Sequence, residues 1–172
     1  MQRPRVGSGS QRHDRIVVVR PKERSHDGFV LTASAPTNRM QDLVRIVLGS
    51  FMLLAGISHL SFRRVEFQAQ VPPWVPLDPD FVVLASGVLE IILGSAMILC
   101  GRWRVWIGCA LAVFYIMVFP GNISQYARGI DAFGLNTESA RLIRLFFQPV
   151  LVALALWSTG ALRALFPRRH PR

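Results

Sequence analysis

The sequence is poor in the residues and motifs on which many catalytic and metal sites depend. It has 2 cysteines in 172 residues, too few for a disulfide framework or a four-thiolate zinc site. Cys100 and Cys109 lack the C-x-x-C spacing of a thiol–disulfide relay, and the histidines show no metal-ligand spacing. No phosphate-binding G-x-x-x-x-G-K, dinucleotide-binding G-x-G-x-x-G or nucleophile G-x-S-x-G motif occurs. No cofactor, metal or catalytic residue is therefore evident, which favours a non-catalytic protein.

Charge is also scarce, and it is one-sided. Charged residues make up 17% of the chain and hydrophobic residues 51%, whereas a soluble domain usually has about 25% charged residues. The formal net charge is nevertheless +10, from 20 Lys and Arg against 10 Asp and Glu. A chain that is both apolar and basic has to separate the two kinds of residue. The separation divides this chain into a polar start and an apolar remainder.

Residues 1–41 are the polar part, and they carry 8 of the 20 basic residues. Their apolar runs, 16–19 and 29–31, are shorter than the roughly 7 to 15 residues of a signal-peptide core. This composition predicts a disordered basic tail, and residues 167–172 form a second, short basic tail. Met40 stands directly before the first apolar block and is an alternative to Met1 as the start of the chain.

Four apolar blocks follow, at residues 43–62, 81–100, 105–119 and 142–162. A helix that crosses the hydrocarbon core needs about 20 residues, and the third block reaches this length with its flanks Trp103 and Pro120. Four such helices in so short a chain would leave no polar shell to cover them in water. Residues 42–166 are therefore predicted to form an all-α, integral membrane four-helix bundle with four transmembrane helices.

The basic residues predict its orientation. If both termini share a side, that side holds 15 of the 20 basic residues and the opposite side holds 5. The positive-inside rule then places both termini in the cytoplasm of a multi-pass membrane protein. Because these residues flank the apolar blocks and no nucleic-acid-binding motif occurs, the predicted partner is the lipid bilayer, not nucleic acid.

Polar residues inside the blocks are candidate functional residues, because they are costly in a membrane. Each block carries them at three- or four-residue spacing, on one helix face with small residues. We expect these faces to meet in a ligand-binding cavity that opens outward, with Glu90 at its floor and Arg45 reaching toward Glu90 from the inner face. The alternative is that the polar groups only pair and fasten the bundle. The candidate cavity residues are His59, Glu90, Tyr115, Asn122, Arg144 and Gln148.

Several motifs resemble the DoxX-like family of small four-helix bacterial membrane proteins, over roughly residues 40 to 165. They are R-x-x-L-G (45–49), G-I-S-H (56–59), P-P-W-V-P (72–76), S-G-V-L-E-I-x-L-G (86–94), F-P-G-N-I (119–123) and R-x-x-x-Q (144–148). The resemblance implies an accessory subunit of a redox or stress-response system in the bacterial inner membrane, with a membrane redox partner or a homo-oligomer. The cavity would then hold a small molecule or a quinone headgroup. The alternatives are a small membrane enzyme or a proton-linked carrier that uses Glu90 and His59.

Overall fold

The computed structural model describes residues 35–134 and 136–166, which contain helices and turns but no strand. The long helices are α1 (Arg39–Leu60), α3 (Pro79–Leu99), α4 (Arg104–Ala127) and α5 (Glu138–Ser158), and the short ones are α2 (Arg64–Gln68), a 3₁₀ turn (Gly101–Trp103) and α6 (Ala161–Leu165). By length and composition, the four long helices suffice to cross a membrane, α4 together with the 3₁₀ turn before it. Within the described residues, the prediction of an all-α bundle with four helices long and apolar enough to span a membrane is confirmed.

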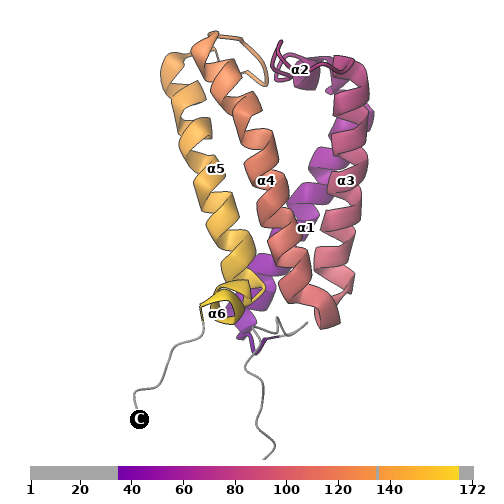
Figure 1. The fold of residues 1–172 in the computed structure, drawn as a ribbon, viewed down its shortest axis with the longest axis vertical. Helices are drawn as coiled ribbons and strands as arrows, with labels where there is room; N and C mark the ends of the chain where they lie inside the picture. The colour runs from indigo at the N-terminus through magenta and orange to yellow at the C-terminus, as the bar shows by residue number, and fades with distance from the viewer. Residues whose placement is uncertain (1–34, 135, 167–172) are drawn as a thin grey trace, which may run out of the picture. The chain divides into compact units, whose positions relative to one another are not determined.

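The long helices form two closely packed pairs (Figure 1). α1 packs mainly along α3, and α4 packs mainly along α5. The start of α1, the α3–α4 turn and α6 lie at one end, the α6 end; α2 and the α4–α5 connection lie at the opposite, α2 end. The two pairs approach each other at the α6 end and diverge toward the α2 end.

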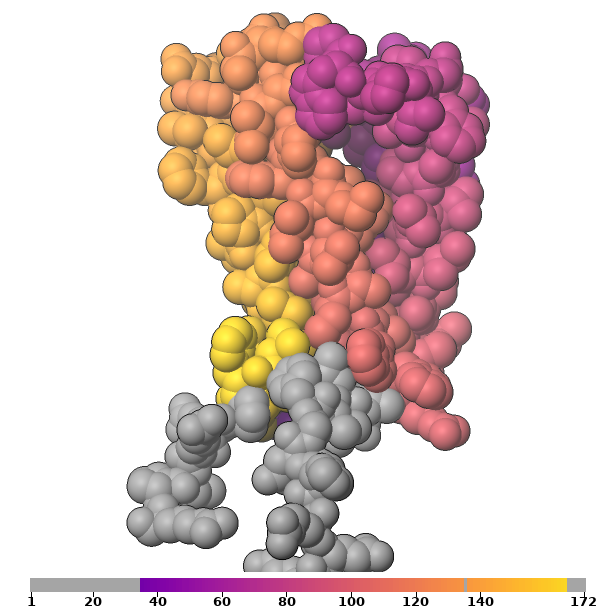
Figure 2. Space-filling model, in the orientation of Figure 1, coloured from indigo at the N-terminus to yellow at the C-terminus, as the bar shows by residue number. Residues whose placement is uncertain are grey.

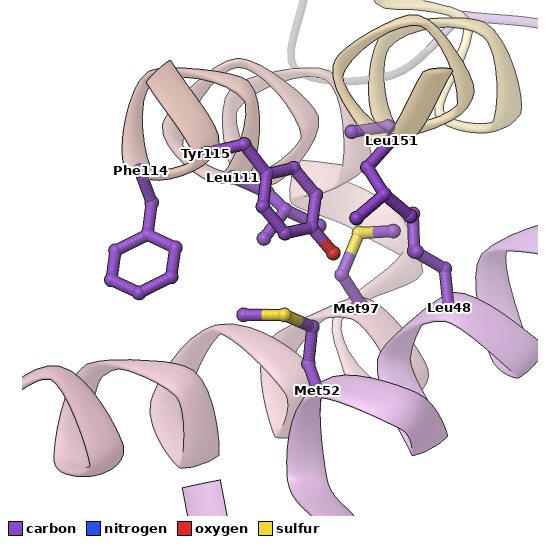
Figure 3. Close-up of a cluster of buried hydrophobic side chains, with 8 residues drawn as sticks. Leu48, Met52, Met97, Leu111, Phe114, Tyr115 and Leu151 are labelled. Carbon is purple, nitrogen blue, oxygen red and sulfur yellow. The ribbon is translucent and has the colours of Figure 1, made fainter. Parts of the chain in front are cut away.

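A cluster of buried side chains from all four long helices joins the pairs (Figure 3). It consists of Leu48, Met52, Met97, Leu111, Phe114, Tyr115, Leu151 and Ala155. Many other large apolar side chains face outward instead, among them Val47, Ile116 and Phe146, each more than half exposed. An outer surface of this kind is unusual for a soluble protein, where large exposed apolar patches mark contact with a partner or a membrane.

The bundle begins earlier in the chain than predicted. The Asn38 side chain accepts a hydrogen bond from the Gln41 backbone N–H at 2.8 Å, and the Gln41 side chain accepts one from the Asn38 N–H at 3.1 Å. This reciprocal capping box starts α1. Ala35 is buried against Val105 and Ala161. Residues 35–41, predicted as the end of the tail, are thus part of the bundle, and the predicted tails 1–34 and 167–172 lie outside the described residues.

Helix lengths also differ from the apolar blocks. α4 continues through Pro120 to Ala127, eight residues beyond the third block, because its last two turns are helical but polar and hydropathy does not detect them. α5 ends at Ser158, and Gly160, with φ +76°, turns the chain into α6. Left-handed backbone of this kind favours glycine.

Candidate functional site

Glycines bring α1 and α3 into backbone contact. A Cβ atom on Gly56 would lie 2.6 Å from the carbonyl oxygen of Gly87, and one on Gly94 would lie 2.7 Å from the carbonyl oxygen of Gly49. The two glycines of each helix are seven residues apart, so they lie on one face. Small residues at such positions allow the close helix packing that is common in membranes. The contact holds the polar residues of these two faces against each other.

His59 and Glu90 meet at this contact. Nδ1 of His59 lies 2.9 Å from Oε2 of Glu90 and also 2.9 Å from the carbonyl oxygen of Ala55. A carbonyl oxygen can only accept, so Nδ1 is the protonated ring nitrogen and donates to Ala55. Oε2 of Glu90 is then within ion-pair distance but has no hydrogen bond from the described residues. Because Glu90 is only 8% exposed, this oxygen is buried and poorly satisfied.

Tyr115 of α4 carries a second buried polar group without a partner. The residue is 4% exposed, and its hydroxyl has no hydrogen bond within the described part of the chain. Figure 3 shows the hydroxyl pointing among Met52, Met97 and Leu151. An unpaired buried hydroxyl costs about 1–3 kcal/mol. Two groups with unmet hydrogen-bonding capacity therefore lie near the middle of the bundle.

Asn122 and Gln148, in contrast, take part in a chain of two hydrogen bonds. Nδ2 of Asn122 donates to Oε1 of Gln148 at 2.9 Å, and Nε2 of Gln148 donates to the carbonyl oxygen of Tyr115 at 2.8 Å. Pro120 lies between Tyr115 and Asn122 in α4. Its backbone nitrogen carries no hydrogen and cannot donate a hydrogen bond to the preceding turn. Gln148 thus supplies a donor to the α4 backbone beside its proline and fastens α5 to α4.

A cavity of about 780 Å³ lies between the helix pairs, toward the α2 end. This volume is within the roughly 300–1,000 Å³ of pockets that hold small ligands. Figure 2 shows an opening between α4 and the α2–α3 region, with α1 behind it. The wall is mostly apolar, and all six predicted residues line it: His59, Glu90, Tyr115, Asn122, Arg144 and Gln148. Among residues 35–134 and 136–166, no group of three or more metal-binding side chains comes together.

Arg45 does not reach this cavity. Its Nη1 donates to the carbonyl oxygen of Met97, and its Nε lies 3.7 Å from Oδ1 of Asp42. The expectation that Arg45 reaches Glu90 from below is therefore wrong, because these two groups hold its guanidinium at the α6 end. Arg45 remains a polar residue of that end, as predicted.

The α2 end of the cavity is covered by a structure that the sequence did not reveal. The Phe67 ring of α2 stacks on His59 at 3.4 Å between centroids, and Phe133 contacts Phe67 at 4.6 Å. The Phe133 N–H donates to Oε2 of Glu66 at 2.9 Å. These contacts hold Phe133 at a φ of 58°, which is rare for an aromatic residue. Both phenylalanines are isolated in polar connections, so no sequence pattern marks them.

An ion pair fixes α2 on α3. The Arg64 guanidinium donates two hydrogen bonds to the carboxylate of Asp80, and these bonds raise the pKa of Arg64 above its usual value. Gln68 also donates to Asp80, at 2.7 Å. Phe67 and Phe133, with Glu66, form the aromatic cover of the cavity. The cover is attached to the α1–α3 pair by α2 and to the α4–α5 pair through Phe133.

The fold and the site together define a four-helix bundle with an amphipathic internal cavity. Residues 48–159 match a family model described as "Domain of unknown function (DUF8561)", and the chain belongs to this family. The matched segment contains all six cavity residues but not Arg45. No curated protein and no solved structure matches the chain.

Proposed function

We propose that the protein is a multi-pass protein of the bacterial inner membrane, with the four long helices crossing the bilayer. The outward apolar side chains support this, because about 25 cal/mol is lost for each Å² of apolar surface left in water. The α6 end, where the start of α1 lies, would face the cytoplasm, in agreement with the excess of basic residues on that side. The choice of the bacterial inner membrane follows from the resemblance to the DoxX-like family.

Reporter fusions test this topology. Pro76 and Gly134 belong to the connections at the α2 end, so fusions there should report an extracytoplasmic position. Fusions at Arg102, in the 3₁₀ turn, and at Arg172 should report a cytoplasmic one. Alkaline phosphatase and green fluorescent protein, each active on one side only, give the readout. A cytoplasmic signal at Pro76 would contradict the proposed orientation.

We infer that the cavity binds a small, lipid-soluble amphiphile. The observation that carries this inference is the pair of buried polar groups, Oε2 of Glu90 and the Tyr115 hydroxyl, that have no hydrogen-bond partner within the described bundle. Both residues line a mostly apolar cavity, so a polar ligand group near them would supply the hydrogen bonds that they lack. A quinone headgroup fits this description. An accessory role in a membrane redox or stress-response system, beside a redox partner, remains part of the proposal.

The openings of the cavity support entry from the bilayer. The lining includes Leu54 of α1, Met117 of α4 and Ile143 of α5, which are 65%, 73% and 69% exposed. The cavity therefore extends to surfaces that would contact lipid. A ligand could place its polar head inside while its chain lies along these apolar edges.

Filling the cavity should block binding. Ser86 of α3 is half-buried and lines the cavity, so Ser86→Phe would place a ring in it. Native mass spectrometry from detergent should show wild-type protein binding oleyl alcohol or a short-chain benzoquinone, and Ser86→Phe should weaken this at least about 10-fold. Ser50→Phe is the matched control, because Ser50 is exposed on α1 and outside the lining. Absence of binding by the wild type, or equal binding by Ser86→Phe, contradicts the proposal.

A membrane enzyme or proton-linked carrier is the second candidate, favoured by the contact between His59 and Glu90. Their 2.9 Å separation is within the reach of proton transfer. The same experiment tests the enzyme candidate when the bound probe is released and its mass is measured. A chemically altered probe indicates an acid–base enzyme, and an unaltered probe agrees with a binding protein or carrier.

A further inference from the structure

The arginines at the α2 end differ in their partners. Arg144 lines the cavity, yet no carboxylate of the described residues lies within ion-pair distance of it. Three neighbouring arginines each have one: Arg63 with Glu66, Arg64 with Asp80, and Arg141 with Asp131. Arg144 thus lines the cavity without a carboxylate partner among the described residues.

The aromatic cover holds Arg144 but does not neutralise it. The guanidinium carbon lies 4.6 Å from the centroid of the Phe133 ring, a cation–π contact worth about 0.5–2 kcal/mol. Withdrawing a guanidinium from water costs several kcal/mol even after relaxation, and Arg144 is only partly exposed. Because Phe133 is itself held by Glu66 and Phe67, the position of the guanidinium is defined. The guanidinium still needs a negatively charged partner.

The other polar groups of the cavity do not supply a negative charge to Arg144. Glu90 is the one carboxylate in the lining, and it lies against His59. Asn122 and Gln148 bond to each other. Arg63 also lines the cavity but pairs with Glu66 at 3.3 Å. Arg144 is therefore the positively charged residue of the lining that has no carboxylate beside it among the described residues.

We propose that the ligand of this cavity is an acidic amphiphile whose carboxylate or phosphate head pairs with Arg144. This inference rests on the proposed binding function and specifies its ligand class. The planar guanidinium matches carboxylate and phosphate groups with two parallel hydrogen bonds. The apolar chain of the ligand lies between the helix pairs, against Phe114 and Leu151, and leaves through a lateral opening.

Three probes with the same chain test the head group: oleate, oleyl phosphate and oleyl alcohol. Native mass spectrometry of the full chain in detergent should show that at least one of the two acids binds about 10-fold or more tightly than the alcohol. The preferred acid identifies the head as carboxylate or phosphate. Arg144→Gln should reduce acid binding to the level of the alcohol and leave alcohol binding unchanged, and Arg144→Lys should keep a preference for the acids.

Arg141→Gln is the matched control. Arg141 is a partly buried arginine one turn earlier in α5, outside the cavity lining and paired with Asp131 at 2.6 Å, so its loss should leave the acid preference intact. Equal binding of the alcohol and both acids, or equal loss of acid binding in the two glutamine variants, would overturn the proposal while the binding function survives. If none of the three probes binds, the proposed function itself fails.

Discussion

Gly56→Val is expected to prevent the stable packing of α1 on α3. A Cβ atom at this position would lie 2.6 Å from the carbonyl oxygen of Gly87 and 2.8 Å from Cγ1 of Ile91. The carbonyl oxygen belongs to the α3 backbone, so it can move away only if the helices separate. Overpacking typically costs about 1–3 kcal/mol where side chains can yield, and more is expected here. With a typical stability of about 5–15 kcal/mol, most of the folded protein should be lost.

The measurement is the yield of monodisperse protein after detergent extraction, together with its melting temperature. Gly101→Val is the control, because a Cβ atom on Gly101 would meet nothing within 4 Å. It should extract and melt like the wild type, and Gly56→Ala should fall between the two. A Gly56→Val protein with wild-type yield and melting temperature would show that α1 and α3 do not touch at their glycines.

Helical periodicity explains why the cavity residues could be predicted. Spacings of three and four place residues on one helix face, and in a small bundle such faces have only the interior to share. Glu90 and Gln148 both come to line the same cavity for this reason. Hydropathy likewise predicted the four long helices, because a long apolar stretch has few other uses.

The partners of these residues could not be predicted. A rise of about 1.5 Å per residue gives the position along one helix, but tilt and rotation against the neighbours decide which atoms meet. Glu90 contacts His59, whereas Gln148, which is near Glu90 in expected depth, bonds to Asn122 and the Tyr115 carbonyl. The position of Arg45 was predicted wrongly for the same reason, because its guanidinium donates to the nearby Met97 carbonyl of α3.

The cover of the cavity was missed for a different reason. Phe67 and Phe133 lie in connections far apart in the sequence and contact each other. Neither connection has a repeating pattern of apolar residues that would predict which way its side chains point. The capping box of Asn38 and Gln41 was, however, visible in the sequence as N-x-x-Q. It would have moved the start of the bundle to before residue 39.

Opposite stability changes are expected when the two buried polar residues on α3 and α5 become leucine. Glu90→Leu should leave the melting temperature unchanged or raise it. Oε2 of Glu90 has no hydrogen bond from the described residues, and the His59 N–H keeps its acceptor at Ala55, so no partner is left unpaired. Burial of a carboxylate costs several kcal/mol unless the group is paired and hydrogen-bonded, and leucine removes this cost. Glu90→Gln should stay close to the wild type.

Gln148→Leu should instead destabilise, because it strands the Asn122 amide and removes the donor to the Tyr115 carbonyl. Each stranded buried group costs about 1–3 kcal/mol, and a domain of this size loses about 2–4 °C of melting temperature per kcal/mol. Tryptophan fluorescence during heating in detergent measures both variants under one condition. A large drop for Glu90→Leu would show that its carboxylate fastens the bundle. Retained stability would mean that the bundle tolerates a poorly satisfied carboxylate for the sake of a ligand, as functional sites commonly do.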